Sequence, residues 1–129
     1  MSFIFNNPNP DELFVDDCVV RALRIALDQS WRDTYLDICA QGALMYDMPS
    51  SNYVWGEYLL LKGFTKHPIL SECKTCYKLK DFCEDHPEGT FVVGTGFHAV
   101  AVIDGDYYDT SDSGNCIPIY YYQKEESTE

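Results

Sequence analysis

The stretch FHAVAVIDGDYYDT, residues 97–110, decides the fold because it joins a strand pattern to a tight-turn signal. Residues 97–103 alternate between two faces, with the period of a β-strand. Asp104-Gly105 is a strong signal for a two-residue hairpin turn. Short segments rich in β-branched and aromatic residues lie on either side, at 90–95 and 116–124. We therefore expect a hairpin within an antiparallel sheet that occupies the last third of the chain.

The register of this hairpin indicates which acid can meet His98. With a two-residue turn, Asp109 lies on the same face as His98, at a diagonal of about 7–8 Å. Asp112 then points to the opposite face, whereas a three-residue loop shifts the register by one and favours Asp112. Asp109 is therefore the predicted partner of His98, and Asp112 is the alternative.

The second informative stretch is VDDCVVRALRIAL, residues 15–27. It is apolar apart from two arginines after its acidic start, which predicts a helix buried on most sides. Asp16 and Asp17 stand where a helix needs its cap and its first-turn acids. Cys18 thus lies at the beginning of the helix, where the partial positive charge favours a thiolate, while the two neighbouring carboxylates oppose it.

The remaining patterns predict helices first and strands afterwards. Ser30 is a plausible cap for a helix over 31–46, and further helices are expected at about 52–61 and 78–86. Residues 1–15 are interpreted as an extended lead-in. This order is typical of an α+β fold in which N-terminal helices pack on a C-terminal antiparallel sheet.

Length, charge and cysteine content narrow the class of protein. The 129 residues fit one domain spanning 1–129, with a flexible tail at 124–129. The net charge of −12 argues against a nucleic-acid partner, which would need clustered Lys and Arg. No apolar run approaches the roughly 20 residues of a membrane span, and no export signal is recognisable. We therefore expect a cytoplasmic protein with reduced thiols.

A zinc site is one alternative for the other cysteines. Cys73, Cys76, Cys83 and His86 have a compact spacing that could hold the ion in a small interaction protein. The same residues also fit a short helix followed by a Pro-Gly turn and a strand. The favoured interpretation therefore includes no metal and no other cofactor.

DDCVVRAL together with HAVAVIDGDYYDT resembles the papain-like cysteine peptidase superfamily. The nearest likeness is to small uncharacterised bacterial and phage proteins of that fold, and the pattern is also similar to the double-glycine leader peptidases. The resemblance covers about residues 16–28 and 78–123. It implies a papain-like fold with Cys18 as nucleophile, His98 as general base and Asp109 as the residue that orients the imidazole. The implied reaction is hydrolysis or acyl transfer at a peptide or isopeptide bond of a peptide or protein substrate.

One element of that family pattern is absent. Papain-like enzymes usually place a Gln a few residues before the Cys to complete the oxyanion hole, and no Gln precedes Cys18. Asn6, Asn7 and Asn9 could donate instead, although none has the matching spacing. A missing donor costs about 10²–10³ in rate. A weakly active or inactive papain-like module that binds a protein partner is therefore a second alternative.

Overall fold

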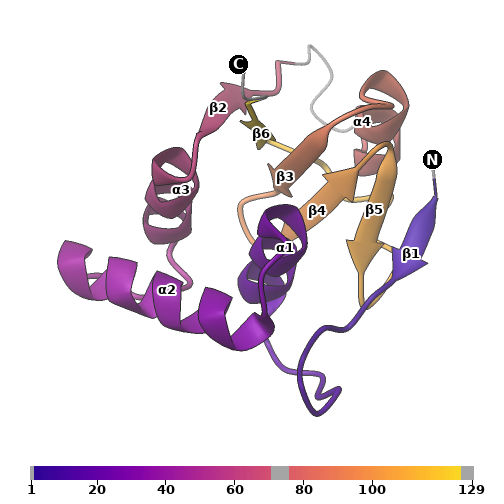
Figure 1. The fold of residues 1–129 in the computed structure, drawn as a ribbon. Helices are drawn as coiled ribbons and strands as arrows, with labels where there is room; N and C mark the ends of the chain where they lie inside the picture. Colours follow the sequence, from indigo (N-terminus) through magenta and orange to yellow (C-terminus); the bar gives the residue numbers. More distant parts are fainter. Residues whose placement is uncertain (1, 71–75, 126–129) are drawn as a thin grey trace.

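The chain has an α+β fold, seen in a computed structural model that describes residues 2–70 and 76–125 (Figure 1). A six-stranded mixed sheet has the spatial order β1-β5-β4-β3-β6-β2. Its strands are β1 (Phe3–Phe5), β2 (Phe64–Pro68), β3 (Thr90–Gly94), β4 (Ala99–Ile103), β5 (Asp106–Asp109) and β6 (Tyr120–Lys124). The described helices are α1 (Cys18–Leu27), α2 (Trp31–Met45), α3 (Asn52–Leu61) and α4 (Leu79–Asp85).

The predicted hairpin is confirmed as β4 and β5. Asp104 and Gly105 both have positive φ, +51° and +82°, which is the backbone conformation that a two-residue turn of this hand requires. Ile103 pairs with Asp106, and the ladder ends where Ala101 pairs with Tyr108. The register is therefore that of the two-residue turn.

The sheet is not purely antiparallel, which corrects one expectation. Part of the supposed lead-in forms β1, which pairs in parallel with β5 at one edge of the sheet. At the other edge, β2 pairs antiparallel with β6. β1 has only three residues and β2 carries little apolar alternation, so neither shows a strand period in the sequence. Lys124 belongs to β6 rather than to a tail, and residues 126–129 lie outside the described part.

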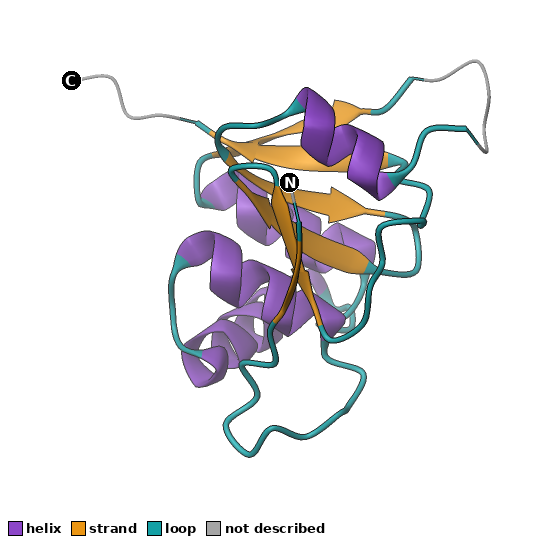
Figure 2. Cartoon of the chain, turned by 90° about the vertical axis from the view of Figure 1, so that its right-hand side faces the viewer, coloured by secondary structure: helices purple, strands orange, loops and turns teal. Residues whose placement is uncertain are grey.

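The helices cover both faces of the sheet, and α4 lies on the face opposite α1 (Figure 2). α1 buries Val20 and Leu23 in a core that includes Ala99 and Ala101 of β4. These two alanines leave room for the helix to lie close to the strand. α4 buries a second core, in which Phe82 packs edge-on against Phe91. Cys18, the first residue of α1, therefore lies on the α1 face of the sheet, next to β4.

α2 and α3 complete the helical layer beside α1. The predicted Ser30 cap is confirmed, since its Oγ accepts a hydrogen bond from the Asp33 N–H at 3.0 Å. Ser51 caps α3 in the same manner and accepts from the Tyr53 N–H. None of the described helices has the length and apolar character that crossing a membrane demands.

Candidate active site

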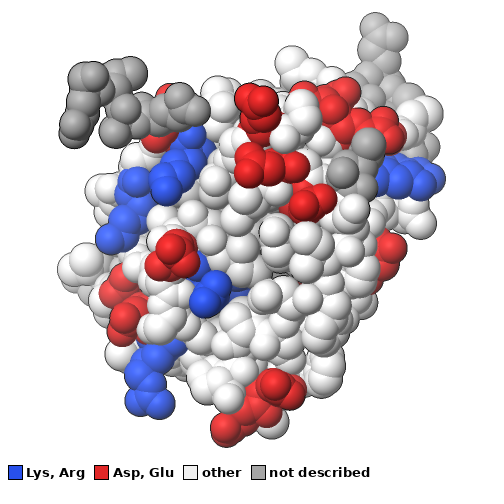
Figure 3. All heavy atoms as spheres, turned by 45° about the vertical axis from the view of Figure 1, so that its right-hand side comes forward, with Lys and Arg blue, Asp and Glu red and all other residues white. Residues whose placement is uncertain are grey.

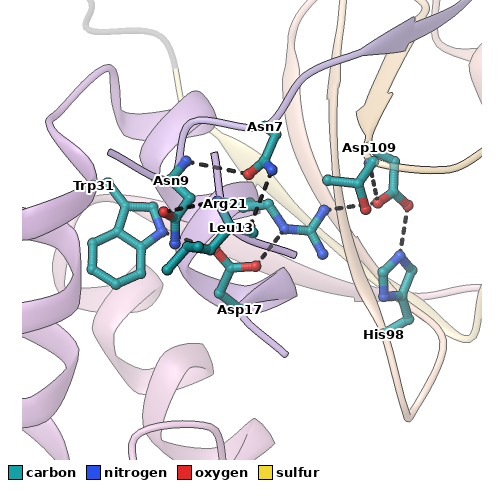
Figure 4. A network of polar contacts seen from close by, with 9 residues as sticks. Asn7, Asn9, Leu13, Asp17, Arg21, Trp31, His98 and Asp109 are labelled. Carbon is teal, nitrogen blue, oxygen red and sulfur yellow. Dashed lines mark hydrogen bonds and ion pairs between the residues drawn. The ribbon is translucent and has the colours of Figure 1, made fainter. Parts of the chain in front are cut away.

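Cys18, His98 and Asp109 meet where three elements end. Cys18 is the first residue of α1, His98 immediately precedes β4, and Asp109 is the last residue of β5. His98 Nε2 lies 2.6 Å from Asp109 Oδ2 (Figure 4). The thiol of Cys18 shares a hydrogen bond with the same imidazole. The three side chains therefore form a continuous chain of hydrogen bonds from thiol to carboxylate.

The surroundings favour a charged thiolate–imidazolium pair. Burial alone raises the pKa of the Cys18 thiol, but the His98 bond, the Ala99 N–H and the nearby positive charges outweigh it and lower the pKa below its usual value. The hydrogen bond to Asp109 is the main cause that raises the pKa of His98 to about 9. At neutral pH the imidazole is therefore protonated, and the thiol beside it is more acidic than an ordinary cysteine.

Asp109 stays ionised although its side chain is only 2% exposed. Burial raises the pKa of this carboxyl, but the hydrogen bonds from His98 and Arg21 hold it well below its usual range. The Arg21 guanidinium donates from its terminal Nη1 to Asp109 Oδ1 at 2.9 Å, and the Thr110 N–H donates to the same oxygen at 2.7 Å. Both carboxylate oxygens are therefore occupied, one by His98 and the other by these two donors.

Asp17 does not cap α1 with its side chain, which corrects the expected role of this acid. Its Oδ1 accepts from Arg21 Nε at 2.8 Å, and its Oδ2 accepts from Trp31 Nε1 at 2.9 Å. The negative charge of Asp17 is thus paired with Arg21 and does not oppose the Cys18 thiolate. Sequence reasoning did not assign Arg21 a role, although the i,i+4 spacing of Asp17 and Arg21 is the usual signal for an ion pair on a helix.

The alternative acid, Asp112, lies elsewhere. Its Oδ1 accepts from the Tyr107 hydroxyl and from the Gly114 N–H, at 2.9 Å in the second case. These contacts fold the loop that follows β5. Among the described residues, Asp109 is the acid that contacts His98.

The three asparagines considered as oxyanion donors lie in the segment that leads to α1, and none of them lines the cavity beside Cys18. Asn7 Nδ2 donates to the Leu13 carbonyl, and Asn9 Oδ1 accepts from the Asp11 and Leu13 N–H groups. The backbone N–H of Asn6 donates to the Asp109 carbonyl. These contacts order the approach to Cys18. The Cys18 backbone N–H lies in the first turn of α1, where N–H groups have no partner within the helix, and is therefore a candidate donor to an oxyanion.

A cavity of about 600 Å³ opens beside Cys18 and His98. Trp31, Tyr35 and Trp55 line its walls together with aliphatic side chains, so its surface is largely apolar and carries three aromatic rings. Asn52 also lines it, but its side chain is occupied, because Nδ2 donates to the Gly96 carbonyl and Oδ1 accepts from Trp55 Nε1.

The rim of this cavity carries an exposed aromatic ring. Phe97 borders the cavity and is 98% exposed. Val15, on the segment leading to α1, also borders it and is half-exposed. An apolar acyl group or side chain would find contacts both in the cavity and at its mouth.

The residues considered as zinc ligands do not form a metal site in the described part of the chain. Cys83 is fully buried in the core beneath α4, and His86 stacks on Phe82 and shares a hydrogen bond with its carbonyl. Cys76 is disulfide-bonded, which makes its sulfur unavailable as a zinc ligand and corrects the expectation that the thiols are reduced. Cys73 lies outside the described residues. Within residues 2–70 and 76–125, no group of three or more His, Cys, Asp or Glu side chains is arranged to hold a metal ion.

Known proteins offer no relative from which a function could be transferred. No family model, no curated protein and no solved structure matches this chain. The functional interpretation therefore depends on the geometry around Cys18.

Proposed function

We propose that the chain is a cysteine hydrolase or acyltransferase of papain-like type that acts on a peptide or isopeptide bond. The observation that carries this proposal is the hydrogen-bonded series Cys18–His98–Asp109 at the wall of an aromatic cavity. A lowered thiol pKa, a base within reach and a third group that orients the base are the parts that an activated cysteine nucleophile requires.

The geometry supports a two-step reaction. The Cys18 thiolate attacks the carbonyl carbon, and the His98 imidazolium gives its proton to the leaving amine, so that a thioester forms and an amine departs. Water or another amine then attacks the thioester while His98 takes up the incoming proton, which regenerates the thiolate. Asp109 holds the ring through Nε2 and stabilises its charged form. The developing oxyanion would lie against the Cys18 backbone N–H, next to the positive end of α1.

The substrate is proposed to be a polypeptide with a large apolar residue near the cleaved bond. Trp31, Tyr35 and Trp55 offer such a side chain an aromatic cavity, and the exposed Phe97 extends that surface outward. On the face drawn in Figure 3, Lys and Arg form separate small groups among the acidic side chains, with broad uncharged areas between them. We further propose a cytoplasmic location, where the free Cys18 thiol stays reduced and the disulfide of Cys76 is an exception.

A protein-binding module without catalysis is the second candidate, and one observation favours it. None of Asn6, Asn7 and Asn9 lines the cavity beside Cys18, and the amide of Asn52, which does line it, donates to the Gly96 carbonyl. In that case the cavity and Phe97 would form a docking surface for an apolar peptide segment. The two candidates differ in whether the Cys18 thiol is activated.

Thiol alkylation distinguishes the two candidates. The wild-type chain is treated with limiting iodoacetamide between pH 5 and 8, and the modified cysteine is identified by peptide mass spectrometry. Selective modification of Cys18 at pH 6 is expected, because its pKa is lowered, whereas burial raises the pKa of the Cys83 and Cys116 thiols. His98→Gln should abolish the selectivity, and Cys116→Ser serves as the matched control that leaves it unchanged.

Turnover is tested in parallel with fluorogenic peptidyl amides that carry Phe, Leu or Gly beside the reporter amine. Release of the reporter by the wild-type chain and its loss in Cys18→Ala support the enzyme. Slow and equal labelling of Cys18 and Cys116, unaffected by His98→Gln, would contradict the proposal and leave the binding module.

A further inference from the structure

Arg21 occupies a position that packing alone does not explain. It lies one helical turn after Cys18, its side chain is 9% exposed, and it reaches across to the end of β5. Its Nε binds Asp17 Oδ1 at 2.8 Å while its Nη1 binds Asp109 Oδ1 at 2.9 Å. One guanidinium thus joins two buried carboxylates, and only Asp109 among them touches the imidazole.

The contacts continue without a break from Trp31 at the cavity wall to the imidazole of His98 (Figure 4). Trp31, which lines the cavity, donates its indole N–H to Asp17, and Asp17 fixes the Nε side of Arg21. Arg21 then holds one oxygen of Asp109, and the other oxygen holds His98. The planar fork of an arginine can satisfy two partners in fixed directions at once, which the single ammonium of a lysine cannot do in the same way.

We propose that Arg21 is a positioning residue for the Cys18–His98–Asp109 site: by holding Asp109 Oδ1, it keeps Oδ2 directed at His98 Nε2 and so keeps the imidazole in place beside the thiol. This inference rests on the proposed function. Asp17, anchored by Trp31, serves as the second support that fixes the direction of the guanidinium. The Asp17 carboxylate makes no capping bond to α1, and it accepts hydrogen bonds from Arg21 and Trp31 instead.

The Thr110 N–H also donates to Asp109 Oδ1, but it acts on the residue directly before it and moves with the end of β5. Arg21 belongs to α1, the element that carries Cys18. It therefore ties the acid to the nucleophile's own helix, so that thiol, imidazole and carboxylate keep one mutual geometry. Titratable groups facing this cluster are Cys18 and Asp17 from the α1 side, His98 before β4, and Cys116, whose thiol senses the charge of Asp109.

If Arg21 only stabilises the fold, its substitution should lower the stability of the protein and leave the titration of His98 unchanged. The test must therefore measure the protonation of the imidazole. The chain has three histidines, and imidazole NMR can follow each of them against pH, with His98→Gln assigning the resonance. Arg21→Lys keeps the charge but loses the fork. We expect the pKa of His98 to fall by at least one pH unit from about 9 in this variant, because Asp109 is freed to turn away. Arg24→Lys, on the same helix, is the matched control and should leave His98 unchanged.

The pH dependence of Cys18 alkylation by iodoacetamide is the second measurement. Its pH midpoint should rise by at least half a pH unit in Arg21→Lys, and its rate at pH 6 should fall at least threefold. Asp17→Asn, which keeps the side-chain shape and Arg21 itself, should change both quantities in the same direction by a smaller amount. If Arg21→Lys does not fold, Asp17→Asn tests the positioning role of Arg21 in its place.

The outcomes distinguish failure of the positioning role of Arg21 from failure of the proposed function. If Arg21→Lys, or Asp17→Asn in its place, lowers the urea midpoint but retains the wild-type titration of His98 and alkylation of Cys18, Arg21 is structural only and the inference is overturned. If wild-type His98 titrates near 6.5 and His98→Gln does not alter Cys18 alkylation, the proposed function fails and the inference fails with it.

Discussion

His98 Nε2 lies 2.6 Å from Asp109 Oδ2 although neither residue belongs to the ladder that joins β4 to β5. The paired residues of that hairpin end at Ala101 and Tyr108. The imidazole and the carboxylate therefore meet at the open end of the hairpin, beyond the β4–β5 pairs, where Asp109 pairs with Phe5 of β1 instead. Their direction is set instead by side-chain contacts, above all by Arg21 on Asp109. This location explains how a residue of α1 can reach both the thiol and the acid.

Replacing Asp109 should impair the thiol far more than replacing Asp112. Asp109→Ala removes the main cause that raises the pKa of His98, so the imidazolium is lost near its ordinary pKa of 6.5 and the Cys18 thiolate loses its partner. Loss of the orienting acid in a triad costs up to about 10⁴ in turnover. Asp112→Asn, whose side chain contacts Tyr107 and Gly114, is the matched control. Peptidyl amide hydrolysis measures both, and equal losses would contradict the choice of Asp109.

The stabilising effect of His98 should depend on pH. Its folded-state pKa of about 9 exceeds the ordinary 6.5, so folding favours the protonated ring. That contribution is fully present below pH 6.5 and is lost as the pH rises through 9. The shift corresponds to at most about 3 kcal/mol, and since 28% of the side chain is exposed, solvent screening reduces it.

Urea unfolding of the wild-type chain and of His98→Gln at pH 6 and pH 10 measures this dependence. The difference between the two chains in free energy of unfolding should shrink at the higher pH. His67→Gln controls for the loss of an imidazole, since its ring stacks on Tyr121 away from the thiol. A difference that is constant with pH would show that His98 does not gain its proton on folding.

The indole N–H of Trp31 should contribute to stability independently of its ring. Trp31→Phe keeps an aromatic wall for the cavity but leaves Asp17 Oδ2 without its donor. An unmet buried acceptor costs about 1–3 kcal/mol. The free energy of unfolding should fall by that amount, with Tyr35→Phe as the control for a neighbouring ring, since Tyr35 stacks on Trp31. Equal stability in Trp31→Phe and the wild type would indicate that Asp17 draws its support from Arg21 alone.

Local patterns in the sequence were sufficient to predict the hairpin, the Ser30 cap and the proximity of His98 to Asp109. Each depends on a few neighbouring residues: the Asp104-Gly105 turn sets the register, and a serine before a helix binds the N–H three residues on. The Asp109 prediction was right for the pairing with His98, although the strand parity that supported it does not extend to either residue.

The edge strand β1, the contact between Arg21 and Asp109 and the cavity depend on contacts between distant parts of the chain. The periodicity of a single segment does not predict such contacts. β1 is a three-residue strand that is stabilised by pairing with β5, a hundred residues later in the chain. Arg21 and Asp17 carry an i,i+4 signal, but only the fold brings Asp109 to the same guanidinium. The aromatic cavity likewise needs α1, α2 and α3 together, so its lining could not be predicted from any one helix.

Selectivity for an apolar side chain should depend on Tyr35. This residue lines the cavity and is 45% exposed, so its ring can contact a bound side chain without being required by the core. Burial of a Phe-sized group contributes about 1.5–3 kcal/mol, which corresponds to roughly a tenfold to hundredfold preference. A peptidyl vinyl sulfone with Phe should therefore inactivate Cys18 at least tenfold faster than its Gly analogue, and Tyr35→Ala should reduce that ratio to below about threefold. Tyr53→Ala removes an 80% exposed ring outside the cavity lining and should leave the ratio unchanged. If Tyr35→Ala slows both probes equally, the ring acts on the site as a whole and the apolar residue is recognised elsewhere.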